Sequence, residues 1–254
     1  ALETGLAPDR RNHLYRTERA NLAFAAHVIV PSPHTAALLV SEYGVAENRI
    51  TIAQPGTDQP TGQPNPEDPP LILSVGIQVP RKGHDILLQA LAALVDLPWR
   101  AVIVGAAYDP LYAEELSQLR CNLNLTDRVH FTGQISDNAL TRLYHQATVF
   151  ALATRHEGYG IVFNEAMAHG LPIISCDVGA VSGTLAPDAS LLTPPDDPRA
   201  FAQELNRILD DSSLRAGMAE ASSRAGRDLP GWDSTARLVD TALTRVCSEA
   251  RVRG

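Results

Sequence analysis

The sequence has little of what marks several classes of protein. No apolar run approaches the ~20 residues that a transmembrane helix needs, so a membrane span is excluded. The cysteines are odd in number, far apart and without a C-x-x-C pair, so neither a disulfide framework nor a zinc site is indicated. A reducing compartment suits such a chain, and we expect a cytoplasmic location. The cysteines are Cys121, Cys176 and Cys247.

Positive charge is also scarce. The formal net charge is -8 over 254 residues, which argues against a broad phosphate-backbone footprint and therefore against nucleic acid as a partner. With 44% apolar and 20% charged residues the composition is that of a globular protein, so disorder of the bulk is excluded. At about 100–200 residues per domain, the length allows one large domain or two modest ones. The first residues, Ala1–Gly5, contain neither an initiator methionine nor a signal peptide, and we expect a fragment.

The first 56 residues predict a small helix–strand–helix–strand unit. An amphipathic helix over 9–26 precedes the strand HVIVPS, a helix capped by Ser32 or Thr35, and a strand over Ile50–Ala53. Such a unit is too small to bury a sheet, so we interpret residues 1–56 as the remnant of a larger α/β domain. Residues 54–70 contain six prolines, and we expect the stretch 57–70 to be a semi-rigid linker.

Residues 71–228 alternate between short apolar runs and helical segments. Continuously apolar strands separated by helices predict a parallel sheet with helices on both faces, a Rossmann-like α/β fold. In such a sheet, ligands bind at the carboxyl ends of the strands, where loops lead into helices. The expected strands are 71–75, 101–104, 129–131, 148–154, 172–176 and 190–193; the expected helices are 85–94, 110–122, 138–146, 161–169 and 199–210, followed by 213–225 and 232–251.

The loop over 74–85 places two cations just before a helix. Arg81 and Lys82 would concentrate positive potential where a helix N-terminus already favours phosphate. Lys82 is the only lysine among 21 basic residues, and a compact ammonium is a common phosphate ligand. A solvated basic turn is the competing interpretation.

The loop and helix over 154–172 carry two carboxylates eight residues apart. Glu157 lies before the helix and Glu165 inside it, while Gly158 and Gly160 allow the backbone to approach a ligand. A carboxylate in so apolar a helix is costly unless something hydrogen-bonds to it, and sugar hydroxyls are suitable partners. The competing interpretation has Glu165 capping a neighbouring loop and Glu157 in solvent.

The segment EGYGIVFNEAMAHGLP, which begins at Glu157, resembles the E-x7-E signature of the family-4 glycosyltransferases. The resemblance extends to Pro80-Arg81-Lys82-Gly83, to Phe131-Thr132-Gly133, to VIVPS and IAQPGTD, and to Trp232, in the family's order. It therefore covers nearly the whole chain and implies the donor-binding half of a two-domain GT-B enzyme. Such enzymes use nucleotide-sugars and retain the anomeric configuration.

The resemblance also implies roles for individual residues. Lys82 would bind the donor diphosphate, Glu165 the ribose hydroxyls and Glu157 the transferred sugar, so Lys82 and Glu157 are the catalytic candidates. The donor would be a UDP-, GDP- or ADP-sugar, with no cofactor; no DxD motif is present, and we expect no required metal. The remaining donor-binding candidates are Arg81, the backbone of Gly158, Tyr159, Gly160 and Ile161, and Gln134 and Ile135 at the base.

The implied partners lie partly outside the chain. The acceptor would be a glycan or lipid-linked intermediate, and the missing N-terminal domain would supply acceptor contacts and a catalytic histidine. The full enzyme could associate peripherally with membranes. The helix within 229–254 is expected to pack back on the N-terminal domain, and apolar surface exposed there could make this fragment self-associate.

The sequence departs from the family pattern at two places. Ile77 stands where the family commonly has a second phosphate-binding arginine, and Gly179–Gly183 replaces the usual Pro-Glu. A degenerate nucleotide-sugar-binding subunit is therefore one alternative, and an epimerase of the same architecture another. The third is a dinucleotide-binding oxidoreductase, because Gly158-x-Gly160-x-x-Phe163 followed by Asp177 imitates a Rossmann fingerprint.

Overall fold

The structure is a computed structural model that describes residues 7–253, with side chains described up to Ser248. Its chain divides into two compact units: unit 1 comprises residues 1–58 and 229–254, and unit 2 comprises Gln59–Asp228. The segment Ala1–Gly5, on which the expectation of a fragment depended, lies outside the described residues. Among the described residues no helix is both long and apolar enough to cross a bilayer.

Among its described residues, unit 1 holds five longer elements and a short 3-10 turn. Strands β1 and β2 are parallel, with Val28 opposite Ile50, and Ser32 caps α2 by accepting from the Thr35 amide at 3.1 Å. Helix α1 buries no residue, and Phe24 at its end is 91% exposed. The elements are α1 (Pro8–Phe24), β1 (Val28–Val30), α2 (Pro33–Ser41), the 3-10 turn Glu47–Arg49, β2 (Ile50–Ile52) and α10 (Trp232–Arg253).

Helix α10 returns to the N-terminal residues within unit 1. It contacts β2, and the Thr235 hydroxyl donates to the Gln54 carbonyl at 2.6 Å. The Thr57 amide donates to the Pro230 carbonyl at 2.8 Å. A Cβ on Gly56 would lie 2.3 Å from the backbone nitrogen of Trp232, so only glycine lets this segment pass so close to the start of α10. The final helix and the segment 54–57 are therefore fixed to each other.

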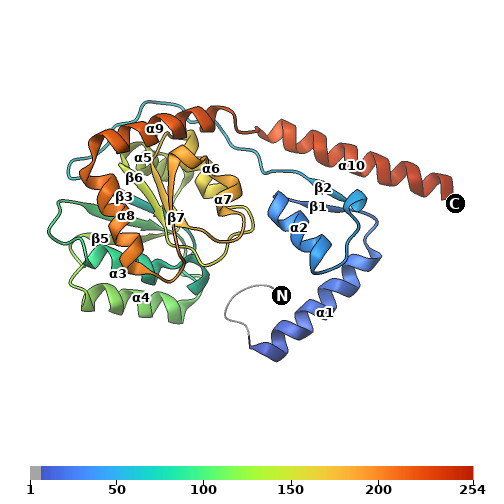
Figure 1. The fold of residues 1–254 in the computed structure, drawn as a ribbon, viewed down its shortest axis with the longest axis horizontal. Coiled ribbons are helices and arrows are strands. Elements are labelled where there is room, and N and C mark those ends of the chain that lie inside the picture. The colour runs from blue at the N-terminus through green and yellow to red at the C-terminus, as the bar shows by residue number, and fades with distance from the viewer. Residues whose placement is uncertain (1–6, 254) are drawn as a thin grey trace. The chain divides into compact units, whose positions relative to one another are not determined.

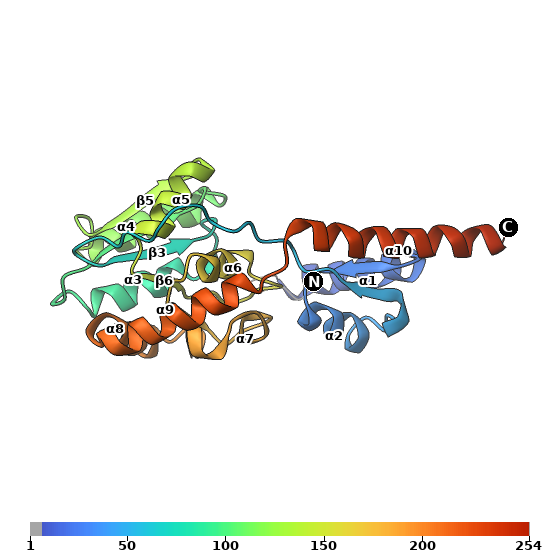
Figure 2. The ribbon, with the colours of Figure 1, turned by 90° about the horizontal axis from the view of Figure 1, so that it is seen from above.

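Unit 2 is a six-stranded parallel sheet in the order β5-β4-β3-β6-β7-β8, which confirms the Rossmann-like prediction. Helices α3 and α4 lie on one face, and α5, α6 and α9 on the other (Figure 1 and Figure 2). The strands are β3 (Leu71–Val75), β4 (Arg100–Val104), β5 (Val129–Gly133), β6 (Val149–Leu152), β7 (Ile173–Cys176) and β8 (Ser190–Thr193). The helices are α3 (His84–Ala92), α4 (Pro110–Asn122), α5 (Asp137–Gln146), α6 (Ile161–Ala168), α7 (Val181–Thr184), α8 (Pro198–Asp210) and α9 (Ser212–Arg227).

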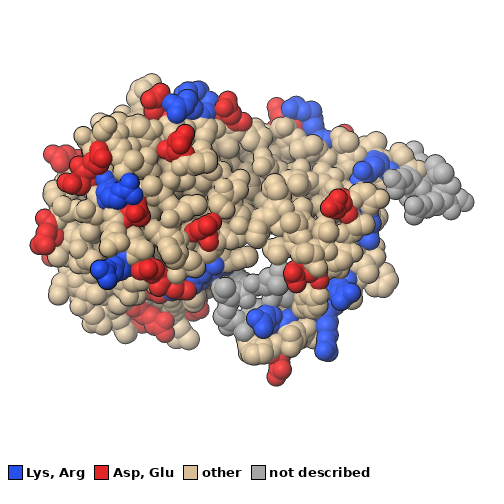
Figure 3. Space-filling model, in the orientation of Figure 1, with Lys and Arg blue, Asp and Glu red and all other residues tan. Residues whose placement is uncertain are grey.

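The sheet forms because its strands are apolar on both faces. All residues of β3, β6 and β7 are buried, as strands covered by helices on both sides must be. The helices begin where the sequence provides caps: Asp109, Ser136, Asp197 and Asp211 each accept a backbone N–H of the first turn. Acidic and basic side chains are interspersed over unit 2 on the face shown in Figure 3.

The proline-rich stretch is attached to unit 2. Asn65 and Glu67 donate their amides to the carbonyls of His145 and Gln146 at 2.8 and 3.0 Å. These carbonyls are at the C-terminus of α5, where a helix cannot satisfy them itself. His145 Nδ1 is also 2.9 Å from the Gln63 carbonyl. The segment 59–70 is thus hydrogen-bonded to the C-terminus of α5 and caps that helix.

The strand order of unit 2 reverses its direction between β3 and β6. From β3 the chain builds outward to β5, then returns to β6 on the other side of β3. The connections after these two neighbouring strands therefore leave in opposite directions, and in doubly wound sheets ligands bind at the carboxyl ends of such strands. Gly83, with φ +65°, lies so close to the end of β6 that an added Cβ would be 1.8 Å from the Ala153 carbonyl oxygen.

This approach makes Gly83 sensitive to substitution. Gly83→Ala should lower the free energy of unfolding by about 2 kcal/mol or more, because the methyl meets a backbone oxygen and the residue must keep a left-handed conformation. The control is Gly217→Ala within α9, where nothing lies within 4 Å of the added Cβ. It should stabilise by roughly 0.5–1 kcal/mol through helix propensity. Urea unfolding measures both; equal effects would contradict the close approach.

Candidate functional site

Lys82 is buried at the end of the loop that follows β3. The loop closes in a 3-10 turn, Pro80–Lys82, directly before α3. Lys82 is 9% exposed, so the solvated-turn interpretation is wrong. Its side chain passes over Gly76, where a Cβ would lie 3.1 Å from the Lys82 Cδ. Ile77, at the position of the family's arginine, is half-buried.

Glu157, from the loop after β6, receives the Lys82 ammonium. Lys82 Nζ donates to Glu157 Oε1, and Glu157 is 5% exposed, so it does not lie in solvent. Arg81 Nη1 is 3.7 Å from the same oxygen and donates to the His156 carbonyl at 3.1 Å. Two cations therefore face one carboxylate where the loops after β3 and β6 meet.

The backbone of Glu157 is held by the loop after β7. The Ala180 amide donates to the Glu157 carbonyl at 2.9 Å, and a Cβ on Gly179 would lie 2.2 Å from that oxygen. The Thr154 hydroxyl lies 3.4 Å from Glu157 Oε1. The segment Gly179–Gly183, which lacks the family's Pro-Glu, thus supports the loop that carries Glu157.

Helix α6 begins directly after the loop that carries Glu157. Gly160 has φ +85°, and a Cβ there would lie 2.5 Å from the Phe163 ring, so glycine permits the turn. Tyr159 is buried, and its hydroxyl accepts from Asn164 Nδ2 at 2.5 Å. The backbone from Gly158 to Ile161 therefore enters the helix in a fixed conformation.

Glu165 is half-buried on α6. The Tyr144 hydroxyl of α5 donates to its Oε2 at 2.8 Å. Burial raises the pKa of the Glu165 carboxyl, although this hydrogen bond opposes the shift. The hydrogen-bond donor that the structure places beside the Glu165 carboxylate is thus a tyrosine hydroxyl. A carboxylate whose ordinary solvation is reduced favours further hydrogen-bond donors such as sugar hydroxyls.

Gln134 and Ile135 follow the end of β5, two strands from β3. Gln134 is exposed and Ile135 half-buried. The Gly105 amide, directly after β4, donates to the Gly133 carbonyl at 3.1 Å, so the loops after β4 and β5 are adjacent. No hydrogen bond joins Gln134 or Ile135 to Lys82, Glu157 or Glu165 among the described contacts.

His84, to which the sequence analysis gave no role, is fully buried beneath the first loop. Its Nε2 is 3.1 Å from the Gly76 carbonyl, and its Nδ1 has no hydrogen-bond partner among the described residues. Burial lowers its pKa to about 4, and the Lys82 charge acts in the same direction. The neutral ring therefore donates from Nε2 and fixes the start of the loop.

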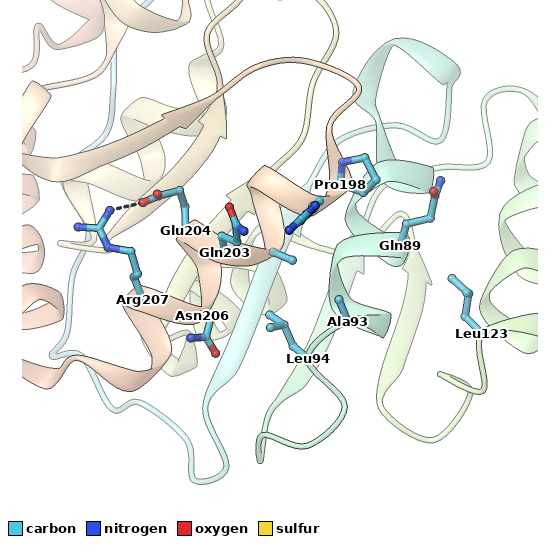
Figure 4. A pocket seen from close by; sticks show the side chains of 11 residues that line it. Gln89, Ala93, Leu94, Leu123, Pro198, Gln203, Glu204, Asn206 and Arg207 are labelled. Atoms are coloured by element: carbon cyan, nitrogen blue, oxygen red, sulfur yellow. Dashed lines mark hydrogen bonds and ion pairs between the residues drawn. The ribbon is translucent and has the colours of Figure 1, made fainter.

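A separate surface groove of about 870 Å³ lies in unit 2 between α3 and α8 (Figure 4). Gln89 of α3 and Leu94, which follows that helix, line it opposite Glu204 and Arg207, which form an ion pair at 2.5 Å. The groove contains none of the residues that the sequence singled out. In the described part of the chain, no three His, Cys, Asp or Glu side chains gather as they would around a metal ion.

The sequence analysis missed the residues that support the site. Arg155 binds Asp85 through a bidentate hydrogen bond, and Tyr144 donates a hydrogen bond to Glu165. These pairs are 70 and 21 residues apart in the sequence. Gly179 carried a usable signal, because a glycine in the loop that follows a buried strand can mark a left-handed turn or a close backbone approach. The sequence contained no signal for the Arg155–Asp85 and Tyr144–Glu165 pairs.

A family model described as "Glycosyl transferases group 1" matches residues 57–225. A D-inositol 3-phosphate glycosyltransferase of Xylanimonas cellulosilytica is 30% identical over 93% of this chain and 60% of its own length. The protein of the same name from Thermobifida fusca is 29% identical over 92% of this chain and 58% of its own length. The chain thus spans little more than half the length of these curated relatives.

Solved structures share the fold. Sucrose-phosphate synthase of Thermosynechococcus elongatus matches with a TM-score of 0.83 and 28% identity, over 94% of this chain and 62% of that one. HepE of Anabaena, solved with UDP and glucose, matches with a TM-score of 0.81 and 22% identity, over 92% of this chain and 67% of that one. The second likeness concerns the fold alone.

The buried neutral imidazole of His84 makes the free energy of unfolding depend on pH. The pKa of His84 is about 4 in the folded chain and ordinarily 6.5, so the unfolded chain binds the proton first as pH falls. His84 therefore contributes stability above pH 6.5 that is lost progressively towards pH 4. Between pH 7 and 5 the wild type should lose about 2 kcal/mol more than His84→Gln, which cannot titrate.

Urea unfolding of both proteins at the two pH values gives this difference. Glu165 and Asp85 titrate in both proteins, so their contributions cancel in the comparison. Parallel losses in the two proteins would show that His84 is protonated in the folded state.

Proposed function

The chain belongs to the group 1 glycosyl transferases, and from this premise we propose that unit 2 binds the nucleoside-diphosphate sugar from which the whole enzyme transfers a hexosyl group. The observation that carries the proposal is the meeting of Lys82 and Glu157 where the loops after β3 and β6 come together. The family assignment favours this function over a dinucleotide-binding oxidoreductase.

Lys82 binds the diphosphate of the donor. Departure of a nucleoside diphosphate develops negative charge on the leaving group, and a buried cation such as Lys82 stabilises that charge more than one in water. Arg81, 3.7 Å from Glu157, supplies a second cation near the position where Ile77 replaces the family's arginine. With two cations and the first turn of α6, the site needs no metal ion.

Glu157 and Glu165 bind hydroxyl groups of the donor. Glu157 is charge-paired beside the diphosphate position, so it contacts the transferred sugar. Glu165, turned towards α5 by the Tyr144 hydroxyl, accepts from the ribose. The backbone of Gly158–Ile161 lies against the sugar and diphosphate, and Gln134 and Ile135 line the base. We assign the donor to the UDP, GDP or ADP class.

The acceptor is a glycan or lipid-linked molecule, bound largely by residues outside unit 2. The assignment to residues outside unit 2 is supported by the greater length of the curated relatives, of which this chain covers 60% and 58%. Transfer with retention follows from the E-x7-E resemblance. A second candidate is a nucleotide-sugar-binding subunit without turnover, which Ile77 favours; it shares donor binding and differs only in activity.

Titration calorimetry of the chain with UDP, GDP, ADP and NAD tests the proposal. One nucleoside diphosphate should bind, and Lys82→Met and Glu165→Gln should each weaken it by about 1.5 kcal/mol or more through loss of a charged hydrogen bond. Matched controls are Arg224→Met and Glu220→Gln, which remove the same kinds of charge from an exposed i,i+4 pair on α9. Both controls should bind as wild type.

Each other outcome has a defined meaning. Binding of NAD alone would establish the oxidoreductase alternative. Binding of a nucleoside diphosphate unaffected by Lys82→Met would place the ligand elsewhere. Absence of binding to all four ligands would contradict the proposal that unit 2 forms the donor site.

A further inference from the structure

One side chain joins three loops at the carboxyl edge of the sheet. Arg155 belongs to the loop after β6, between Thr154 and Glu157. Its Nη1 and Nη2 donate to the two carboxylate oxygens of Asp85, in the first turn of α3, at 2.8 and 2.7 Å. Its Nε donates at 2.6 Å to Asp196, which follows β8. The planar guanidinium suits this arrangement because its donors form a rigid fork.

Arg155 also holds the backbone that precedes Lys82. Its Nη1 donates to the Pro80 carbonyl at 2.5 Å, and its own amide donates to the Arg81 carbonyl at 2.8 Å. The Thr154 hydroxyl lies 3.1 Å from that same carbonyl oxygen. The two residues before Lys82 are therefore bonded to the loop that carries Glu157.

Asp85 is in turn fixed from the opposite side. The Tyr112 hydroxyl of α4 donates to its Oδ1 at 2.6 Å. Burial alone would raise the pKa of Asp85, but the hydrogen bonds from Arg155 and Tyr112 hold it below its ordinary value. The carboxylate therefore stays ionised and anchors the guanidinium to the helix that begins just after Lys82.

Arg155 is engaged too fully to serve as a phosphate ligand. Four of its N–H donors bond to Asp85, Asp196 and Pro80, out of five in a guanidinium. Two carboxylates surround its single charge. Its contacts end on backbone and on structural carboxylates, whereas Lys82 and Glu157 point to each other.

We propose that Arg155 is a positioning residue for donor binding: with Asp85 it locks the loop of Lys82 onto the loop of Glu157, so that the ammonium is in place before the diphosphate arrives. The inference depends on the function proposed above. A cation whose backbone is already ordered costs less conformational entropy on binding than one on a mobile loop. Arg155 thus contributes to affinity through Lys82 without touching the ligand.

A double-mutant cycle on Arg155 and Lys82 tests this coupling. The probe is whichever of UDP, GDP and ADP the wild type binds, measured by calorimetry. Arg155→Lys keeps the charge but loses the fork, and it should weaken binding about tenfold, the effect of losing one well-placed charged hydrogen bond. Lys82→Met should weaken it further. The double variant should bind as Lys82→Met does, within about twofold, because Arg155 has no cation left to position.

The control separates local positioning from a general effect of the substitution. Arg224→Lys makes the same chemical change at an exposed pair with Glu220 on α9 and should leave binding unchanged. If Arg155→Lys does not fold, as judged by its melting transition, Asp85→Asn replaces it in the cycle. That variant keeps Arg155 but removes the charge of its anchor, and the same non-additivity is expected.

The outcomes distinguish this inference from the proposed function. If no nucleoside diphosphate binds, or Lys82→Met binds as wild type, the donor-site proposal fails. If Lys82→Met loses binding while Arg155→Lys binds as wild type, the positioning role alone is overturned. Fully additive losses in the double variant would likewise overturn it, since they would show that Arg155 acts independently of Lys82.

Discussion

The parallel pairing of β3 with β6 is the constraint on which the site depends. Ile72 lies opposite Val149 and Leu73 opposite Phe150, all within a sheet covered by helices on both faces. The pairing brings the ends of two strands together although the chain builds β4 and β5 between them. Everything assigned to the donor diphosphate follows from loops that leave these two strands, so a change in register here would separate Lys82 from Glu157.

The stability of the fold does not by itself account for the burial of Lys82 and Glu157 in those loops. Removing a lysine and a glutamate from water has a desolvation cost that their attraction often fails to recover, and an apolar pair of similar volume is commonly as stable. Here the pair is accompanied by Arg81 and supported by Thr154 and by the loop of Gly179 and Ala180. Burial of such a pair is expected where function rather than stability requires the charges, which agrees with the donor site proposed above.

The sequence predicted the sheet because its strands are apolar runs bounded by glycine and proline, and helix and strand boundaries agree with the structure to within a few residues. The loops that carry Lys82 and Glu157, and the helix that carries Glu165, were predicted from strand ends and from the E-x7-E spacing. The supporting contacts were not, because Arg155 meets Asp85 across 70 residues and Lys82 meets Glu157 across 75. Local patterns contain no signal for such pairs.

The division of the chain separates donor binding from the rest of the reaction. All the candidate residues lie in unit 2, whose sheet has a buried core of its own. Unit 1 is built differently: α1 buries no side chain, and Phe24 and Trp232 are 91% and 52% exposed. The residues to which we assign donor binding all lie on elements of unit 2, so on this proposal the affinity for the nucleotide is a property of that unit. Turnover also requires an acceptor, whose contacts we assign largely to residues outside unit 2, so a chain that binds the donor and transfers nothing is consistent with the proposal.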